Sequence, residues 1–158
     1  MTHPQGQHGS RGFSLIELIV VIILLGILSV IISARFFDTS QFQSAGFSED
    51  VINAFRYAQK TAIASGCEVQ ASYDSGSRQY ALYFRGGGSD TSCGTGAFSE
   101  LVRSPQDNSG FTGMGPSDIT GSGSLAVVFD AGGSPSSGGS FVIGSRTINV
   151  SPVTGYVY

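Results

Sequence analysis

The side chain whose chemistry stands out first is that of Glu17, because it is the single charged residue in a nearly unbroken apolar run from Phe13 to Ala34. A helix of that length, about 22 residues at 1.5 Å each, is long enough to cross a bilayer core of roughly 30 Å. A carboxylate inside such a run costs about 2.5–3.5 kcal/mol on insertion scales. We therefore treat Glu17 as a candidate functional residue that needs a cationic partner at the same depth.

A second pattern lies at the start of this run, in the segment Arg11-Gly12-Phe13-Ser14-Leu15-Ile16-Glu17. The segment resembles the class III signal of type IV pilins and of type II secretion pseudopilins. The resemblance implies that a prepilin peptidase cuts between Gly12 and Phe13 and methylates the new N-terminal residue, Phe13. It also implies that Glu17 is the glutamate at the fifth position of the mature chain.

Cleavage at this place would supply the cation that Glu17 needs. A new α-amino group at Phe13 has a reference pKa near 7.7–8.0 and lies one helical turn from Glu17. In a packed filament, the amine of one subunit could neutralise Glu17 of its neighbour and set the axial register. The partners that the resemblance implies are other pilin or pseudopilin subunits, the prepilin peptidase and the inner-membrane assembly platform.

Two simpler interpretations of the apolar run remain, a secretory signal peptide and a plain membrane anchor. A signal peptide has 7–15 apolar residues with its cleavage site after them, whereas this run is longer and its signal precedes it. A plain anchor gives no reason for Glu17. The pilin-like interpretation predicts a single-pass inner-membrane protein with a periplasmic C-terminal domain, which later joins a pilus or pseudopilus filament.

Cys67 and Cys93 are the only cysteines of the chain. In a domain exported to an oxidising compartment, two cysteines indicate one disulfide, and two free thiols are the alternative. Closing a loop of about 25 residues would stabilise the fold by roughly 3–4 kcal/mol in the chain-entropy model.

The 158 residues, of which 12% are charged and 23 are glycine, predict one small domain with an appendage. We expect a leader at 1–12, a transmembrane and assembly helix at 13–35, and a globular domain at 36–158. Apolar residues at spacings of three and four predict an amphipathic helix at about 47–65, through Phe47, Val51, Phe55, Ala58 and Ala62. Alternating patterns then predict a β-meander over about 67–158, with strands at 68–73, 79–84, 98–102, 125–129, 140–143, 147–150 and 155–158. The expected fold class is α+β and pilin-like, a long N-terminal helix packed against an antiparallel sheet.

No catalytic, cofactor or metal constellation emerges from the sequence. The two histidines, His3 and His8, lie in the leader, so a serine or cysteine nucleophile has no histidine base in the mature chain. Asp90, Asp118 and Asp130 lack the spacing of a calcium loop. We therefore predict that the protein is not an enzyme and that it needs no cofactor.

The basic residues of the strand region are scattered, whereas DNA binding needs several clustered Lys or Arg side chains. These residues are Arg78, Arg85, Arg103 and Arg146. Nucleic acid is accordingly not a predicted partner.

Beyond the N-terminal run, the segments Val51–Gly66 and Thr154–Tyr158 resemble minor pilins of the mannose-sensitive haemagglutinin type. They are also similar to the H-type pseudopilins of type II secretion. The predicted function is that of a minor pilin of the first type. The alternative is an H-type pseudopilin, and a second alternative is an adhesin or a minor pilin of DNA uptake.

Overall fold

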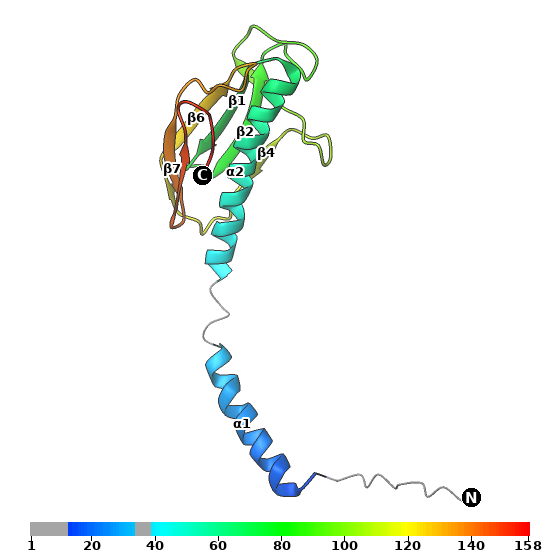
Figure 1. Cartoon of the computed structure of the whole chain (residues 1–158), viewed down its shortest axis with the longest axis vertical. Helices are drawn as coiled ribbons and strands as arrows, with labels where there is room; N and C mark the ends of the chain where they lie inside the picture. The colour runs from blue at the N-terminus through cyan, green and yellow to red at the C-terminus, as the bar shows by residue number, and fades with distance from the viewer. Residues whose placement is uncertain (1–12, 34–38) are drawn as a thin grey trace, which may run out of the picture. The chain divides into compact units, whose positions relative to one another are not determined.

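The computed structural model describes residues 13–33 and 39–158, and its contacts divide the chain into two units. The first unit contains one described element, helix α1 (Leu15–Ser33). The second, called the C-terminal unit here, is Thr39–Tyr158 and contains helix α2 and eight strands (Figure 1).

Helix α1 consists almost entirely of leucine, isoleucine and valine, without proline. It starts where the Leu18 N–H donates to the carbonyl oxygen of Ser14, at 3.2 Å. Glu17 lies in its first turn, where a carboxylate complements the helix dipole. The predicted leader at 1–12 and residues 34–35 of the predicted span lie outside the described residues.

Helix α2 (Thr39–Ser65) starts eight residues before the predicted position at Phe47. The apolar period begins only at Phe47, because residues 39–46 lack one, although their side chains are compatible with a helix. The Ser44 hydroxyl donates to the Gln41 carbonyl oxygen within this first part, at 3.0 Å. The helix ends as predicted at Ser65, and the next residue, Gly66, has a φ of 68°, the left-handed conformation that glycine adopts readily.

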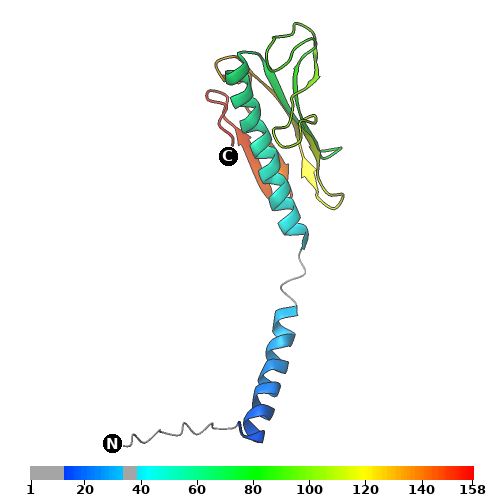
Figure 2. The same cartoon turned by 90° about the vertical axis from the view of Figure 1, so that its right-hand side faces the viewer.

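The predicted apolar stripe of α2 forms the centre of the core. Four of its side chains are fully buried, and Phe47 is 6% exposed. Phe55 packs against Phe141, with ring centroids 5.7 Å apart. Figures 1 and 2 show α2 running along one face of the strands, and it contacts β1, β2 and β8 among others. The prediction of an amphipathic helix packed on a sheet is confirmed.

The larger sheet is antiparallel and has the order β3-β2-β1-β6, with β4 also paired to β2. Its strands are β1 (Val69–Asp74), β2 (Gln79–Arg85), β3 (Phe98–Leu101), β4 (Thr112–Met114) and β6 (Ser124–Phe129). The predicted hairpin of the first two strands is confirmed. A simple meander is wrong, because β6 crosses over to pair with β1 along its whole length.

The smaller sheet has the order β5-β7-β8 and is antiparallel. Its strands are β5 (Gly121–Ser122), β7 (Gly139–Ile143) and β8 (Arg146–Val150). The predicted closing strand at 155–158 is shorter than expected and pairs with β8 through a bridge between Val150 and Val157. Strands β4 and β5 were not predicted.

Polar side chains of α2 hold the chain's C-terminal segment against the helix. Arg56 donates to the carbonyl oxygen of Val157 at 2.9 Å. The Gln59 amide donates to the carbonyl oxygens of Gly133 and Thr154, each at 2.8 Å. Both residues lie on α2, so the helix fixes two segments that are far away in sequence.

The turn between β1 and β2 is organised by Asp74. Its carboxylate accepts hydrogen bonds from the hydroxyl of Ser124 at 2.7 Å and from the hydroxyl and N–H of Ser77 at 2.7 and 2.9 Å. These bonds, that from Ser124 first, lower the pKa of Asp74 from 3.8 to about 2. The carboxylate thereby connects the β1–β2 turn to the start of β6.

We predict a pH-dependent stability contribution from Asp74. A carboxyl whose folded-state pKa lies below its unfolded value stabilises the fold above the unfolded pKa, and the contribution disappears as the pH falls through the folded pKa. The wild type should therefore be more stable than Asp74→Asn at neutral pH. This difference should shrink as the pH falls from about 4 to 2. Urea unfolding of both chains across this range measures it, and a difference independent of pH would contradict the assignment.

Candidate functional site

The candidate assembly site lies at the start of α1, where the sequence places Phe13 and Glu17. Phe13 is 79% exposed and Glu17 is exposed on the first helical turn. Gly12, on the other side of the predicted cleavage site, lies outside the described residues. Of the two residues that flank the predicted cleavage site, the structure therefore describes only Phe13.

Apart from Glu17 and Ser29, the described side chains of α1 up to Ser29 are apolar around the helix, and no described residue of the same unit covers them. Its exposed fractions range from 41% at Ile19 to 77% at Leu15. A helix that is apolar all round is normally buried in a larger assembly or in lipid. The side chains concerned are Leu15, Ile16, Leu18, Ile19, Val20, Val21, Ile22, Ile23, Leu24, Leu25, Ile27 and Leu28.

Within residues 13–33 and 39–158, no helix is both long enough and apolar enough to cross a membrane. The predicted single-pass anchor over 13–35 stays a prediction.

Glu17 has no ion-pair partner among the described residues. The ion pairs found there join Arg85 to Glu68 and Arg146 to Glu49, and both lie in the C-terminal unit. The second of these pairs connects β8 to α2, and the hydrogen bond from Arg146 lowers the pKa of Glu49. The cationic partner expected for Glu17 stays a prediction.

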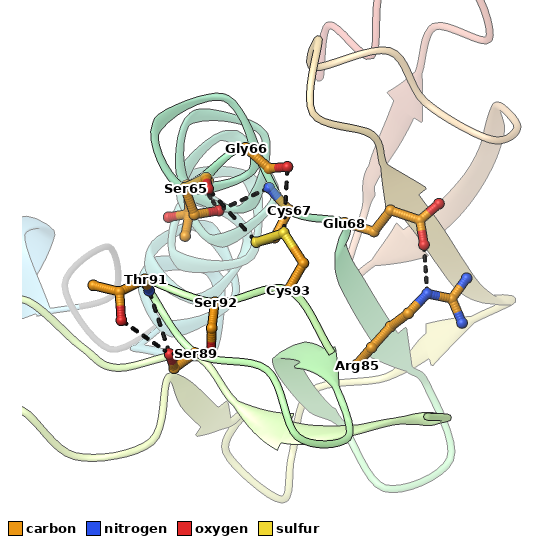
Figure 3. The surroundings of a disulfide bond; sticks show 10 residues. Ser65, Gly66, Cys67, Glu68, Arg85, Ser89, Thr91, Ser92 and Cys93 are labelled. Carbon is orange, nitrogen blue, oxygen red and sulfur yellow. Dashed lines mark hydrogen bonds and ion pairs between the residues drawn. A yellow bond between two sulfur atoms is a disulfide. The ribbon is translucent and has the colours of Figure 1, made fainter. Parts of the chain in front are cut away.

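A disulfide joins Cys67 to Cys93, with an S–S distance of 2.02 Å and Cα atoms 5.1 Å apart (Figure 3). Cys67 lies two residues after the end of α2 and is 4% exposed, whereas Cys93 is exposed in the connection between β2 and β3. The two cysteines are 26 residues apart in the sequence. It ties this glycine-rich connection to the end of the helix.

The connection folds back on itself close to the disulfide. A Cβ atom added to Gly94 would collide with the backbone oxygens of Arg85 and Gly86, so only glycine fits there. The ion pair between Arg85 and Glu68 lies beside the disulfide (Figure 3).

The described residues contain no group of three histidine, cysteine or acidic side chains that could hold a metal ion. Asp90, Asp118 and Asp130 lie in three separate connections between strands. His3 and His8 lie outside the described residues.

One feature of the C-terminal unit was missed by the sequence analysis. It is a surface cavity of about 360 Å³ between α2 and the connection from β3 to β4. Its lining includes Asn53, Tyr57, Gln106 and Phe111. These residues come from segments about 50 positions apart, and no local pattern in the sequence brings them together.

Two family models match the chain. Residues 7–33 match the prokaryotic N-terminal methylation motif, and residues 48–154 match the type II transport protein GspH. The second match covers more than half of the chain and spans the folded part of the C-terminal unit from α2 to its final segment. Comparison with curated proteins and with solved structures found no match.

We predict that removing the disulfide destabilises the C-terminal unit. Cys67→Ser/Cys93→Ser loses the constraint on the unfolded chain, which for 26 residues is worth about 3.5 kcal/mol in the chain-entropy model. Urea unfolding in the absence of reductant measures this loss. A reductant should lower the wild-type stability by a similar amount and leave that of the double variant unchanged. Equal stability of the wild type and the double variant in the absence of reductant would contradict the prediction.

Proposed function

The chain belongs to the family of the type II transport protein GspH and carries the N-terminal methylation motif, and from this premise we propose that it is an H-type pseudopilin. Such a protein is a structural subunit of the filament that serves type II secretion. The observation that carries the proposal is the combination of the two matches in one chain, with the motif on the apolar helix and the family domain after it.

In this proposal the prepilin peptidase removes the leader between Gly12 and Phe13 and methylates Phe13. The apolar surface of α1, exposed within its unit, supports such a role, because lipid and then neighbouring subunits would cover it. Before assembly the protein would reside in the inner membrane as a single-pass protein, with the C-terminal unit in the periplasm. The oxidising periplasm is compatible with the disulfide between Cys67 and Cys93.

The proposed assembly contact is between Glu17 of one subunit and the freed α-amino group of Phe13 in its neighbour. Glu17 has no ion-pair partner among the described residues, which supports a partner in another chain. The assembly platform of the inner membrane would bring the subunits together. This role is structural and needs no catalytic residue.

A minor pilin of the mannose-sensitive haemagglutinin type is the second candidate. The N-terminal methylation motif fits it equally well, since pilins and pseudopilins share this signal. The GspH match favours secretion over a pilus.

We predict that Glu17→Ala blocks assembly without blocking processing. In cells whose chromosomal copy carries this substitution, the chain should lose its leader normally, because the cleavage site is unchanged. It should no longer be cross-linked to neighbouring pseudopilins, and exoproteins should accumulate in the periplasm. Immunoblotting of cross-linked membranes and assays of secreted and periplasmic exoprotein measure these effects.

The matched control is Glu100→Ala, which removes an exposed carboxylate on β3. It should leave both cross-linking and secretion at the wild-type level. Normal secretion combined with loss of surface pili in the Glu17→Ala strain would favour the minor pilin instead. Wild-type cross-linking in that strain would contradict the proposed contact.

A further inference from the structure

The cavity between α2 and the β3–β4 connection combines two kinds of surface. On one side, the rings of Tyr57 and Phe111 stack with centroids 4.9 Å apart and planes 17° from parallel. Around them lie the polar side chains of Asn53, Gln106 and Thr112. Apolar walls with a few directed polar groups are typical of pockets for small ligands.

The wall formed by the connection is held in place by its own hydrogen bonds. The Asp107 carboxylate accepts from the hydroxyl of Ser109 at 2.8 Å and from its N–H at 3.2 Å. The hydrogen bonds from Ser109, and then from Ser104, lower the pKa of Asp107. Ser104 also donates its N–H to the Ser109 carbonyl oxygen at 2.7 Å. The wall is therefore formed before any ligand arrives, which reduces the entropy cost of binding.

The aromatic wall is fixed by the sheet in the same way. Phe111 donates its N–H to the carbonyl oxygen of Val102 at 2.6 Å and accepts at its own carbonyl from the N–H of Leu82 at 3.1 Å. Tyr57 comes from α2, one helical turn after Asn53. Both rings are half-buried, so each has surface left for a ligand.

Two side chains of the lining have free hydrogen-bonding groups. The carboxamides of Asn53 and Gln106 are exposed, and neither bonds to another described residue. Each offers a donor and an acceptor, so together they match ligands whose groups do both, such as hydroxyls. The Thr112 hydroxyl is already engaged, because it donates to the carbonyl oxygen of Tyr80 at 2.9 Å.

The charges of the lining narrow the ligand class. The lining contains no lysine, arginine or histidine, so a phosphate, sulfate or sialic acid would find no cation there. Its one carboxylate, Asp107, is occupied by the hydrogen bonds from serine. The site thus suits an uncharged ligand that presents hydroxyls on one face and C–H groups on another.

We propose that this cavity binds a neutral saccharide, with its C–H face on the Tyr57–Phe111 pair and its hydroxyls on Asn53 and Gln106. The inference goes beyond the role in a filament and is independent of it. A chain that binds no sugar could still assemble, and a chain that fails to assemble could still bind.

The test uses the full-length chain, labelled with ¹⁵N and kept soluble in a detergent without a sugar headgroup. D-glucose, D-galactose, D-mannose and N-acetyl-D-glucosamine are each titrated while NMR records the backbone and side-chain amides. At least one sugar should shift the carboxamide signals of Asn53 and Gln106 and the amide of Gly110, with a Kd on the order of 1 mM. The absence of shifts with all four sugars, or shifts confined to other surfaces, would overturn the proposal.

Substitutions then test the polar contacts. Asn53→Ala and Gln106→Ala should each weaken binding about fivefold, which corresponds to the loss of one hydrogen bond. Both residues are exposed, so the spectra of the variants should otherwise match the wild type. The control Gln70→Ala removes a carboxamide of β1 outside the cavity and should leave the Kd unchanged. An unchanged Kd in both cavity variants would contradict the assignment.

A lysine-containing tripeptide is the competing probe, because Asp107 is the one charge in the lining. It should leave the same signals unshifted. Binding of the peptide in place of the sugars would show that the cavity recognises protein and would overturn the saccharide proposal.

Discussion

The packing of the buried face of α2 is the interaction on which the C-terminal unit depends. Val51, Ile52 and Phe55 are completely buried, and burying each such side chain contributes about 1.5–3 kcal/mol. The same helix contacts strands of both sheets, so the two sheets share one apolar core. Its polar residues Arg56 and Gln59 then fix the C-terminal segment. The helix packs against the central strands β1, β2 and β6 of the larger sheet and against β7 and β8 of the smaller one.

Helix α1 presents the opposite case, since its apolar side chains remain exposed within its unit. Apolar surface of this kind marks a place where another surface is to be bound. The C-terminal unit buries its apolar side chains in a core of its own, whereas the apolar side chains of α1 are exposed within their unit. This difference separates a domain that has its own apolar core from a helix whose apolar side chains are not covered within its unit. Membership of the GspH family agrees with such a division.

Local patterns in the sequence were sufficient to predict the fold class, the core stripe of α2 and the hairpin of β1 and β2. They did not locate the first residue of α2, because residues 39–46 have no apolar period. They also failed for Thr112–Met114 and Gly121–Ser122, which are strands because neighbouring strands pair with them. The pairing of β6 with β1 and the cavity beside Tyr57 depend on contacts across long separations, which periodicity does not encode. The disulfide could be predicted, because the chain has two cysteines in a domain that is expected to be exported.

We propose that α1 becomes an assembly helix when the chain is cut in front of Phe13. Intact-mass spectrometry with N-terminal fragmentation, on protein purified from the cells that make it, tests this most directly. We predict a chain that begins at Phe13 and carries one methyl group on its α-amino nitrogen. A chain that begins at Met1, or at a residue beyond Ala34, would contradict the account.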